Sequence, residues 1–299
     1  MLSTEVDKST LGLADPAAFC KDFVRKHDYV SYLVSHFYPK HLQNGYFAIK
    51  AFSVELATVQ DHVSNTMIGK LRMQFWRDAV KGISDGKPPR HPIALALYEA
   101  SQRSHLPAYH LKRVIDARDA ELYTPTHLTV DSLTSHAEST SSTVLYLLLS
   151  LLSDSSTAIS HAASHLGAAQ TFSTLLRGLP FHAKNGRMVI PAEITAKHGV
   201  NQEEVFRQGP AVQGIEDAVF EFATIANDHM ITARDMFKEE GMEGKVPARV
   251  MPVFLSGVPV ANYLERLEKV NFNAFEPKLQ LRDWKLAWLI WRGFHKRQF

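Results

Sequence analysis

The stretch HLGAAQTFSTLLRGLPFHAKNGRMVIP, residues 165–191, decides the fold class of this chain. Its apolar residues recur at the three- and four-residue spacing of a helix, and a polar turn through Asn185 and Gly186 then stops that helix. The closing segment RMVIP, residues 187–191, is the one β-like piece of the chain. The rest of the sequence has the same helical character, so we predict an all-α protein.

Helical periodicity covers almost every long segment, and stop signals separate the segments. Asp15 and Pro16 predict a helix start, because aspartate caps a first turn and proline fits its first position. Short linkers favour one compact domain over residues 16–299, after a flexible N-terminus of residues 1–15. The predicted helices span residues 16–26, 29–39, 45–63, 66–83, 91–104, 107–122, 130–153, 157–182, 191–198, 202–208, 215–239, 248–256, 259–269 and 281–296.

The composition excludes several classes of protein. The chain has 299 residues, 45% of them hydrophobic, and a net charge of +2, so no strong field attracts nucleic acid and we expect no nucleic-acid partner. The single cysteine, Cys20, excludes an internal disulfide and fits a reducing compartment. The most apolar run, residues 144–152, is far shorter than the roughly 20 residues of a membrane-spanning helix.

The N-terminal 19 residues contain acids but no arginine, unlike a mitochondrial leader. We therefore expect a processed or shortened start, from which the destination of the protein does not follow.

Five stretches, in order along the chain, resemble the squalene/phytoene synthase family of head-to-head trans-prenyl transferases. They are YFAIKAF (46–52), IGKLRMQFWRDAV (68–80), HPIALAL (91–97), VIDARDAEL (114–122) and the opening stretch. Around the last, the family pattern is a Gly-x-Ala helix ending in Arg-Asp-x-x-x-Asp, followed by Gly-Arg-x-Tyr-Leu-Pro. This chain matches it at Gly167, Ala169, Arg177, Gly186, Arg187 and Pro191. The resemblance implies an isoprenoid-synthase-like helical bundle.

The resemblance also implies a metal site, and the sequence departs from it there. Ionising an allylic diphosphate requires Mg²⁺ on the leaving group, and aspartates on facing helices hold that metal. In this chain the positions expected to hold aspartate are occupied by Ala57, Thr58, Gly178 and His182, while Asp61 keeps an acid. We therefore expect no catalytic residues, no metal and no cofactor.

A narrower resemblance points to one noncatalytic branch of the family, the mitochondrial complex I assembly factor 6 group. It is carried by AFSVELATVQDHVS (51–64), IGKLRMQFWRDAV (68–80), AESTSSTVLYL (137–147), HAASHLGAAQ (161–170), RMVIPAEITAKHGV (187–200), NQEEVFRQG (201–209) and FNAFEPKLQ (272–280). Membership implies a pseudoenzyme of the mitochondrial matrix, held peripherally at the inner membrane. Its partners would be complex I subunits or other assembly factors.

Two alternatives stay open. The chain could be a divergent prenyl diphosphate transferase whose metal ligands have moved, or a module that binds a prenyl chain or a lipid.

Basic residues near the end of the opening helix are candidates for anion binding. Arg177, Lys184 and Arg187 could hold an anion, since arginine suits phosphate through its paired donors. The alternative is that Arg187 packs its aliphatic stem and caps a helix end. In VIDARDAEL, Asp116, Arg118 and Asp119 are expected to form solvated or intrahelical ion pairs rather than a second metal site.

The pair His161 and His165 has the i, i+4 spacing that can present two imidazoles to zinc. A third ligand would be required, and His136 and Glu138 are the possibilities. The alternative is tight helix packing, which the small residues between the two histidines also suit.

The last predicted helix carries Trp284, Trp288 and Trp291 at i, i+4 and i+7. Tryptophans next to terminal cations suit a membrane interface. Alternatively, the tryptophans pack into the core. Exposure of the indole rings separates the two interpretations.

Overall fold

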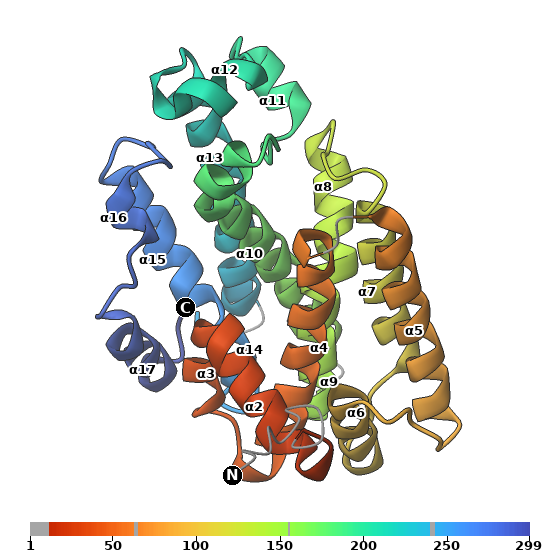
Figure 1. Cartoon of the computed structure of the whole chain (residues 1–299). Coiled ribbons are helices and arrows are strands. Elements are labelled where there is room, and N and C mark those ends of the chain that lie inside the picture. The colour runs from red at the N-terminus through yellow and green to blue at the C-terminus, as the bar shows by residue number, and fades with distance from the viewer. Residues whose placement is uncertain (1–11, 63–64, 155, 240–242) are drawn as a thin grey trace, which may run out of the picture. The chain divides into compact units, whose positions relative to one another are not determined.

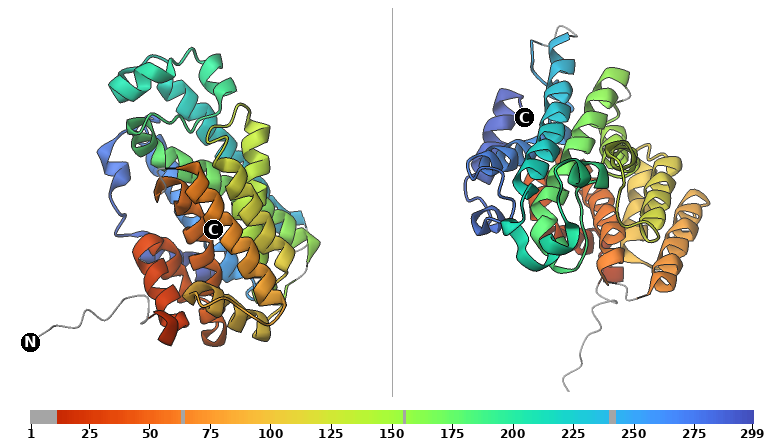
Figure 2. Two further views of the ribbon diagram at one scale, coloured as in Figure 1. Left: turned by 45° about the vertical axis from the view of Figure 1, so that its right-hand side comes forward. Right: turned by 90° about the horizontal axis from the view of Figure 1, so that it is seen from above.

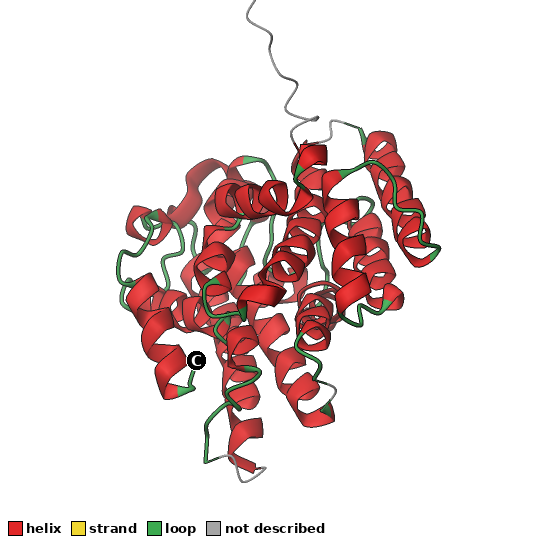
Figure 3. Ribbon diagram, turned by 90° about the horizontal axis from the view of Figure 1, so that it is seen from below, coloured by secondary structure: helices red, strands yellow, loops and turns green. Residues whose placement is uncertain are grey.

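The computed structural model describes residues 12–62, 65–154, 156–239 and 243–299, and every regular element in these ranges is a helix. Figure 3 shows helices joined by loops, with no strand in the described part of the chain. The predicted all-α fold is therefore confirmed. Within the same ranges, no helix combines the length and the apolar character needed to cross a membrane. Of the flexible N-terminus expected at residues 1–15, residues 12–14 are helical and residues 1–11 lie outside the described part.

Backbone contacts divide the chain into two compact units, and each is described by itself. Unit 1 comprises residues 1–122 and 146–155, and unit 2 comprises residues 123–145 and 156–299. The single domain expected from the short linkers stays a prediction.

Unit 1 contains a group of helices around α4 and a pair formed by α5 and α7 (Figure 1). The α2 start agrees with the prediction, because the Asp15 carboxylate accepts a hydrogen bond from the Ala18 backbone at 2.9 Å and Pro16 occupies the first helical position. Trp76 on α5 is fully buried against Phe52 on α4. The helices of this unit are α2 (Pro16–His27), α3 (Tyr29–Ser35), η1 (Lys40–Leu42), α4 (Gln43–His62), α5 (Thr66–Ser84), α6 (Pro92–Arg103) and α7 (Ala108–Glu121).

Unit 2 is built around α10 (Thr157–Lys184) and α13 (Ile215–Glu239), which lie side by side (Figures 1 and 2). Its other helices are α8 (Val130–Ala137), η2 (Glu138–Ser142), α11 (Ala192–Lys197), α12 (Gln202–Gln208), η3 (Gly209–Ala211), α14 (Met251–Phe254), α15 (Gly257–Glu268), α16 (Pro277–Gln280) and α17 (Leu286–Lys296). The predicted boundaries of α13 agree with the structure, whereas the helix predicted at 248–256 is reduced to α14.

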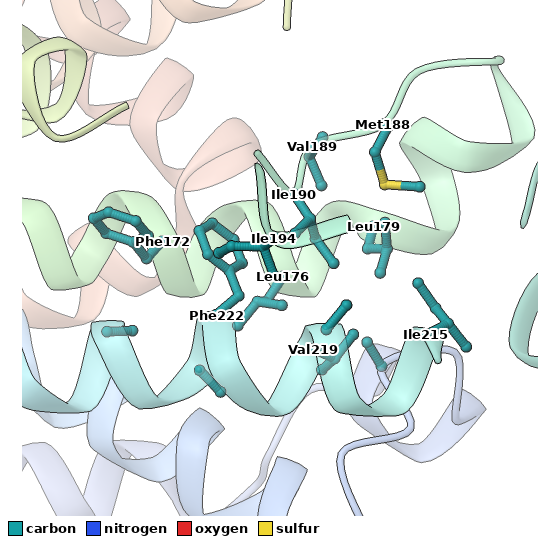
Figure 4. Packing of buried hydrophobic residues seen from close by; sticks show 14 of the residues in the cluster. Phe172, Leu176, Leu179, Met188, Val189, Ile190, Ile194, Ile215, Val219 and Phe222 are labelled. Atoms are coloured by element: carbon teal, nitrogen blue, oxygen red, sulfur yellow. The ribbon is translucent and has the colours of Figure 1, made fainter. Parts of the chain in front are cut away.

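The core of unit 2 explains the β-like stretch RMVIP. Side chains of α10 and α13 face one another in Figure 4, and the extended segment lays Met188, Val189 and Ile190 against them. These three residues form no strand; they are buried because the segment closes the end of the α10–α13 core. The apolar run therefore reflects burial rather than sheet pairing.

A π-helical segment interrupts the helix predicted at 130–153. The prediction covers α8, the π segment η2 and α9 (Thr143–Leu151). At η2 the Thr143 hydroxyl donates to the Glu138 carbonyl at 2.8 Å, and the Ser142 hydroxyl donates across to the Ser164 carbonyl of α10 at 2.8 Å. Gly167 faces this segment, so α10 and η2 approach closely.

The helix predicted at 281–296 is wrong at its start, because α17 begins only at Leu286. Asp283 forms a turn before it: its carboxylate accepts from the Lys285 backbone at 2.9 Å and from the Asn262 side chain of α15 at 3.0 Å. Trp284 therefore lies in this turn and not on the helix that carries Trp288 and Trp291.

Candidate functional site

The C-terminal end of α10 holds the residues that carry the opening sequence pattern. Gly186 has a φ of +69°, the left-handed conformation that favours glycine. Its backbone N–H donates to the Ala183 carbonyl at 2.9 Å, and that of Arg187 donates to the His182 carbonyl at 2.9 Å. These two bonds form a Schellman motif, which ends the helix and leads the chain into the buried segment after it. The Gly186–Arg187 pair of the family pattern thus serves to end the helix.

The two α10 positions expected to hold aspartate lie next to each other on one face of the helix. Gly178 and His182 are both half-buried, one helical turn apart. A Cβ atom at Gly178 would lie 3.0 Å from Cδ2 and 3.1 Å from Nε2 of His182, so the imidazole ring lies over the glycine. The space next to Gly178 is therefore filled by a neutral or cationic ring rather than by a carboxylate.

The three basic candidates at this helix end differ in exposure. Arg177 and Lys184 are exposed, and Arg187 is half-buried. The Gln280 side chain of α16 donates to the Arg177 carbonyl at 3.1 Å. Burial raises the pKa of the neighbouring Tyr263 hydroxyl, and the positive charge of Arg177 partly opposes that rise. The structure thus brings Arg177 close to a buried phenol from α15.

In unit 1, the corresponding positions lie on α4. Ala57 and Thr58 are half-buried, and the Thr58 hydroxyl donates back to the helix carbonyls of Val54 at 3.0 Å and Glu55 at 3.2 Å. Such back-bonding is common for threonine inside a helix. Asp61 lies in the last turn of α4, and its side chain is outside the described part of the structure.

The acidic residues of α7 form ion pairs, but Asp116 and Asp119 pair with another helix, whereas solvated or intrahelical pairs were expected. Arg77 on α5 donates to the Asp116 carboxylate at 2.9 and 3.0 Å and to the Asp119 carboxylate at 2.6 Å. The hydrogen bond with Asp119, followed by that with Asp116, raises the pKa of the Arg77 guanidinium. Arg118 pairs with Glu121 of its own helix at 2.7 Å. Arg77 is the partner that local sequence did not identify.

The α10 histidines belong to a cluster that includes a residue of α13. Nδ1 of His165 lies 2.9 Å from Nδ1 of His229, so one ring donates a proton that the other accepts. The ring of His161 lies 5.0 Å from that of His165, and His229 stacks on Phe172. Burial lowers the pKa of both His165 and His229, and the neighbouring imidazoles lower that of His165 further.

The possible third zinc ligands have other partners. Glu138 accepts a hydrogen bond from the Ser164 hydroxyl at 2.6 Å, and its negative charge raises the pKa of His165. His136 lies against His127, with 5.2 Å between ring centroids. In the described ranges, no group of three or more His, Cys, Asp or Glu side chains has an arrangement that could hold a metal ion.

The three C-terminal tryptophans are exposed. The relative exposure is 84% for Trp284, 55% for Trp288 and 51% for Trp291. The interpretation that places them in the core is therefore not supported, although Trp284 is displaced from the expected helical stripe.

The sequence profile of the squalene/phytoene synthase family matches residues 24–292, which is most of the chain. The chain belongs to the squalene/phytoene synthase family. Within this family it is similar to a protein of Rattus norvegicus named NADH dehydrogenase (ubiquinone) complex I, assembly factor 6. The two are 37% identical over 272 residues, covering 91% of this chain and 80% of the rat protein. A Drosophila melanogaster homolog of that assembly factor is 34% identical, covering 98% of this chain and 86% of its own length. The narrower resemblance is thus confirmed as well.

Solved structures share the fold of this chain. A squalene synthase from Alicyclobacillus acidocaldarius aligns with a TM-score of 0.76 and 16% identity, covering 89% of this chain and 97% of its own. A dehydrosqualene synthase in complex with ligand gives a TM-score of 0.79 and 17% identity, covering 95% and 97%. At these identities the likeness establishes the isoprenoid-synthase-like helical fold.

Proposed function

We propose that this chain is a noncatalytic assembly factor for mitochondrial respiratory complex I. One observation carries the proposal: the imidazole of His182 covers Gly178 where the family resemblance expects two aspartates on one face of a helix. The naming of the relatives supports the assembly role. The proposed location is the mitochondrial matrix, peripheral to the inner membrane, and the proposed partners are complex I subunits or other assembly factors.

The described donor set does not fit Mg²⁺. Mg²⁺ prefers carboxylate and water oxygens, whereas Ala57 and Gly178 offer no side-chain oxygen and His182 offers nitrogen. The Thr58 hydroxyl is already bonded within its helix. Metal stabilisation of a leaving group contributes several kcal/mol, so its loss would slow ionisation by about a thousandfold or more. We therefore assign no catalytic step to these positions.

Two experiments test this function. Deleting the gene should lower the amount of assembled complex I, leave isoprenoid levels unchanged, and be reversed by the wild-type gene. In parallel, the purified full chain should release no pyrophosphate from farnesyl or geranylgeranyl diphosphate with Mg²⁺, with an active squalene synthase as the positive control. Metal-dependent release at enzymatic rates would support a divergent prenyl transferase instead. Co-purification of a stoichiometric lipid would favour a lipid-binding module.

Anion binding by Arg177, Lys184 and Arg187 is a second, separable proposal. Its support is that the positive charge of Arg177 acts on the buried Tyr263, while Lys184 and Arg187 lie at the C-terminal end of the same helix. The competing explanation is that cations stabilise the negative end of a helix dipole. Calorimetric titration with inorganic pyrophosphate decides between them: binding that is lost in R187A would favour an anion site, and a loss of stability in R187A without measurable binding in the wild type would favour capping.

A further inference from the structure

The C-terminal segment of unit 2 carries four large exposed apolar side chains within eleven residues, here called the C-terminal aromatic surface: Leu281, Trp284, Trp288 and Trp291. Leu281 is 68% exposed, and all three indoles are more than half exposed. The opposite face of α17 is the packed one, since Ile290 is fully buried and Gly293 allows close contact with α15. A Cβ at Gly293 would lie 3.1 Å from Val258 and 2.8 Å from a backbone carbonyl of Gln298. The helix is therefore fixed with its tryptophans pointing outward.

Cations accompany these rings. The Lys285 ammonium lies 5.3 Å from the Trp284 ring centroid, and the Arg292 guanidinium lies 5.5 Å from that of Trp288. Residues 281–298 hold five lysines and arginines against the single carboxylate of Asp283, a net charge of +4 with histidine neutral, compared with +2 for the whole chain. Asp283 is half-buried and accepts two hydrogen bonds in the turn before α17. The positive charge is thus left facing solvent.

A groove of about 220 Å³ lies between α15 and α17. Val258, Ala261 and Leu289 give it an apolar wall, and Arg292 and Lys296 line it as cations. Its one acid, Glu265, forms an ion pair with Lys269. The groove therefore offers apolar contact beside positive charge, the combination found where a phospholipid phosphate meets its acyl chains.

We propose that the C-terminal aromatic surface docks on an anionic phospholipid bilayer, with the indole rings at the interface and Lys285, Arg292 and Lys296 on the lipid phosphates. This inference rests on the proposed peripheral location at the inner membrane and names the surface that makes the contact. Tryptophan concentrates at membrane interfaces, and lysines beside it bind anionic headgroups. A protein partner fits less well, because the core of a protein interface is depleted in lysine whereas Lys285 covers the most exposed indole.

Another exposed apolar stripe, on α5, provides a matched control. Met67, Ile68, Leu71 and Phe75 are exposed there, without tryptophan. The flanking charges are of both signs, since Arg72 lies 4.0 Å from Glu55 and Gln74 donates to Asp78. If vesicles bound any exposed apolar surface, substitutions on α5 and in the C-terminal aromatic surface would both weaken vesicle binding. The proposed docking depends on the C-terminal aromatic surface alone.

Vesicle binding by the full chain tests the proposal through its own tryptophans. Three of the four tryptophans lie on the proposed surface, and the fourth, Trp76, is buried at 1% exposure. Vesicles of phosphatidylglycerol and phosphatidylcholine should shift the emission to shorter wavelength, and brominated acyl chains should quench it. Vesicles of phosphatidylcholine alone should do neither. High salt should release the protein, because screening weakens the attraction of cations to the headgroups.

Variants give the decisive comparison, with circular dichroism confirming that each is folded. K285A/R292A should weaken binding about 25-fold, from about fivefold for each cation removed near an anionic surface. W288A/W291A should weaken it at least tenfold, and M67A/L71A should bind as the wild type does. The proposal is overturned if the wild-type protein does not bind anionic vesicles, or if M67A/L71A and W288A/W291A weaken vesicle binding equally.

A protein-docking role for the same surface has its own signature. If W288A/W291A abolishes capture of complex I subunits while vesicle binding is absent in the wild type, the surface is a protein interface and the membrane proposal fails. The vesicle result is independent of the proposed assembly function, because a chain that binds bilayers could still have no effect on complex I levels, and the reverse also holds.

Discussion

Replacing Gly167 by alanine tests the close approach of α10 to the π segment η2. A Cβ at this position would lie 2.3 Å from Oγ and 2.5 Å from both Cα and N of Ser142. Ser142 is fully buried, and its hydroxyl donates to the Ser164 carbonyl at 2.8 Å. Because two of the contacted atoms are backbone, rotation of the serine side chain cannot relieve the overlap. The helices must separate instead.

The expected magnitude combines opposing effects. Alanine is favoured over glycine inside a helix by about 1 kcal/mol. Overpacking costs about 1–3 kcal/mol, and an overlap with backbone belongs at the upper end of that range. Loss of the Ser142 hydrogen bond costs about 1 kcal/mol more. G167A should therefore lower the free energy of unfolding by about 3 kcal/mol despite its better helix propensity.

Urea denaturation followed by circular dichroism measures this change. Gly186 supplies the control, since its φ is +69° and a Cβ there would meet no atom within 4 Å. G186A should therefore lose only the strain of a left-handed residue, about 1 kcal/mol. A G167A protein as stable as the wild type would refute the close packing of α10 against η2, and so would one that is destabilised less than G186A.

Three further predictions concern the candidate sites. The protein should lose stability as the pH falls from 7 to 5.5. Burial lowers the pKa of His165 and His229 in the folded state, so the unfolded chain binds protons first, near the usual pKa of about 6.5. In calorimetric melting scans, H229N should make the melting temperature depend less on pH over this range. R77A should lower the free energy of unfolding by about 1 kcal/mol. R77K should recover only part of that loss, because lysine lacks the forked guanidinium that reaches two carboxylates. Equal stability of the wild type and both variants in urea denaturation would contradict this. Introducing the four acids of the family pattern together, as A57D, T58D, G178D and H182D, should raise the Mg²⁺ affinity measured by calorimetry. An unchanged affinity would contradict the inference that these positions correspond to metal ligands of the family.

Local sequence was sufficient for the helices and for several of their ends. The boundaries of α13, the cap at Asp15 and the stop at Gly186 follow from side chains within a few residues of each boundary. Family membership likewise follows from contiguous patterns, because residues at a fixed spacing on one helix lie on the same face of that helix whatever the rest of the fold. The α10 half of the candidate site, at Gly178 and His182, was predictable for the same reason.

The pairings between helices depended on tertiary structure. Arg77 meets Asp119 from 42 residues away, and His165 meets His229 from 64 residues away, with no periodic signal linking either pair. The close approach of α10 to the π segment at Gly167, and the bond from Asn262 of α15 to the Asp283 carboxylate, likewise join residues far apart in the sequence.

The tryptophans show the division most clearly. Their sequence predicts a helical stripe but not whether that stripe faces core or solvent, because amphipathic spacing alone is compatible with either. Packing of Ile290 and Gly293 against the neighbouring helices turned Trp288 and Trp291 outward. Chain-local forces fix where a helix begins and which residues share its face, whereas burial is decided by what the rest of the chain places against that face.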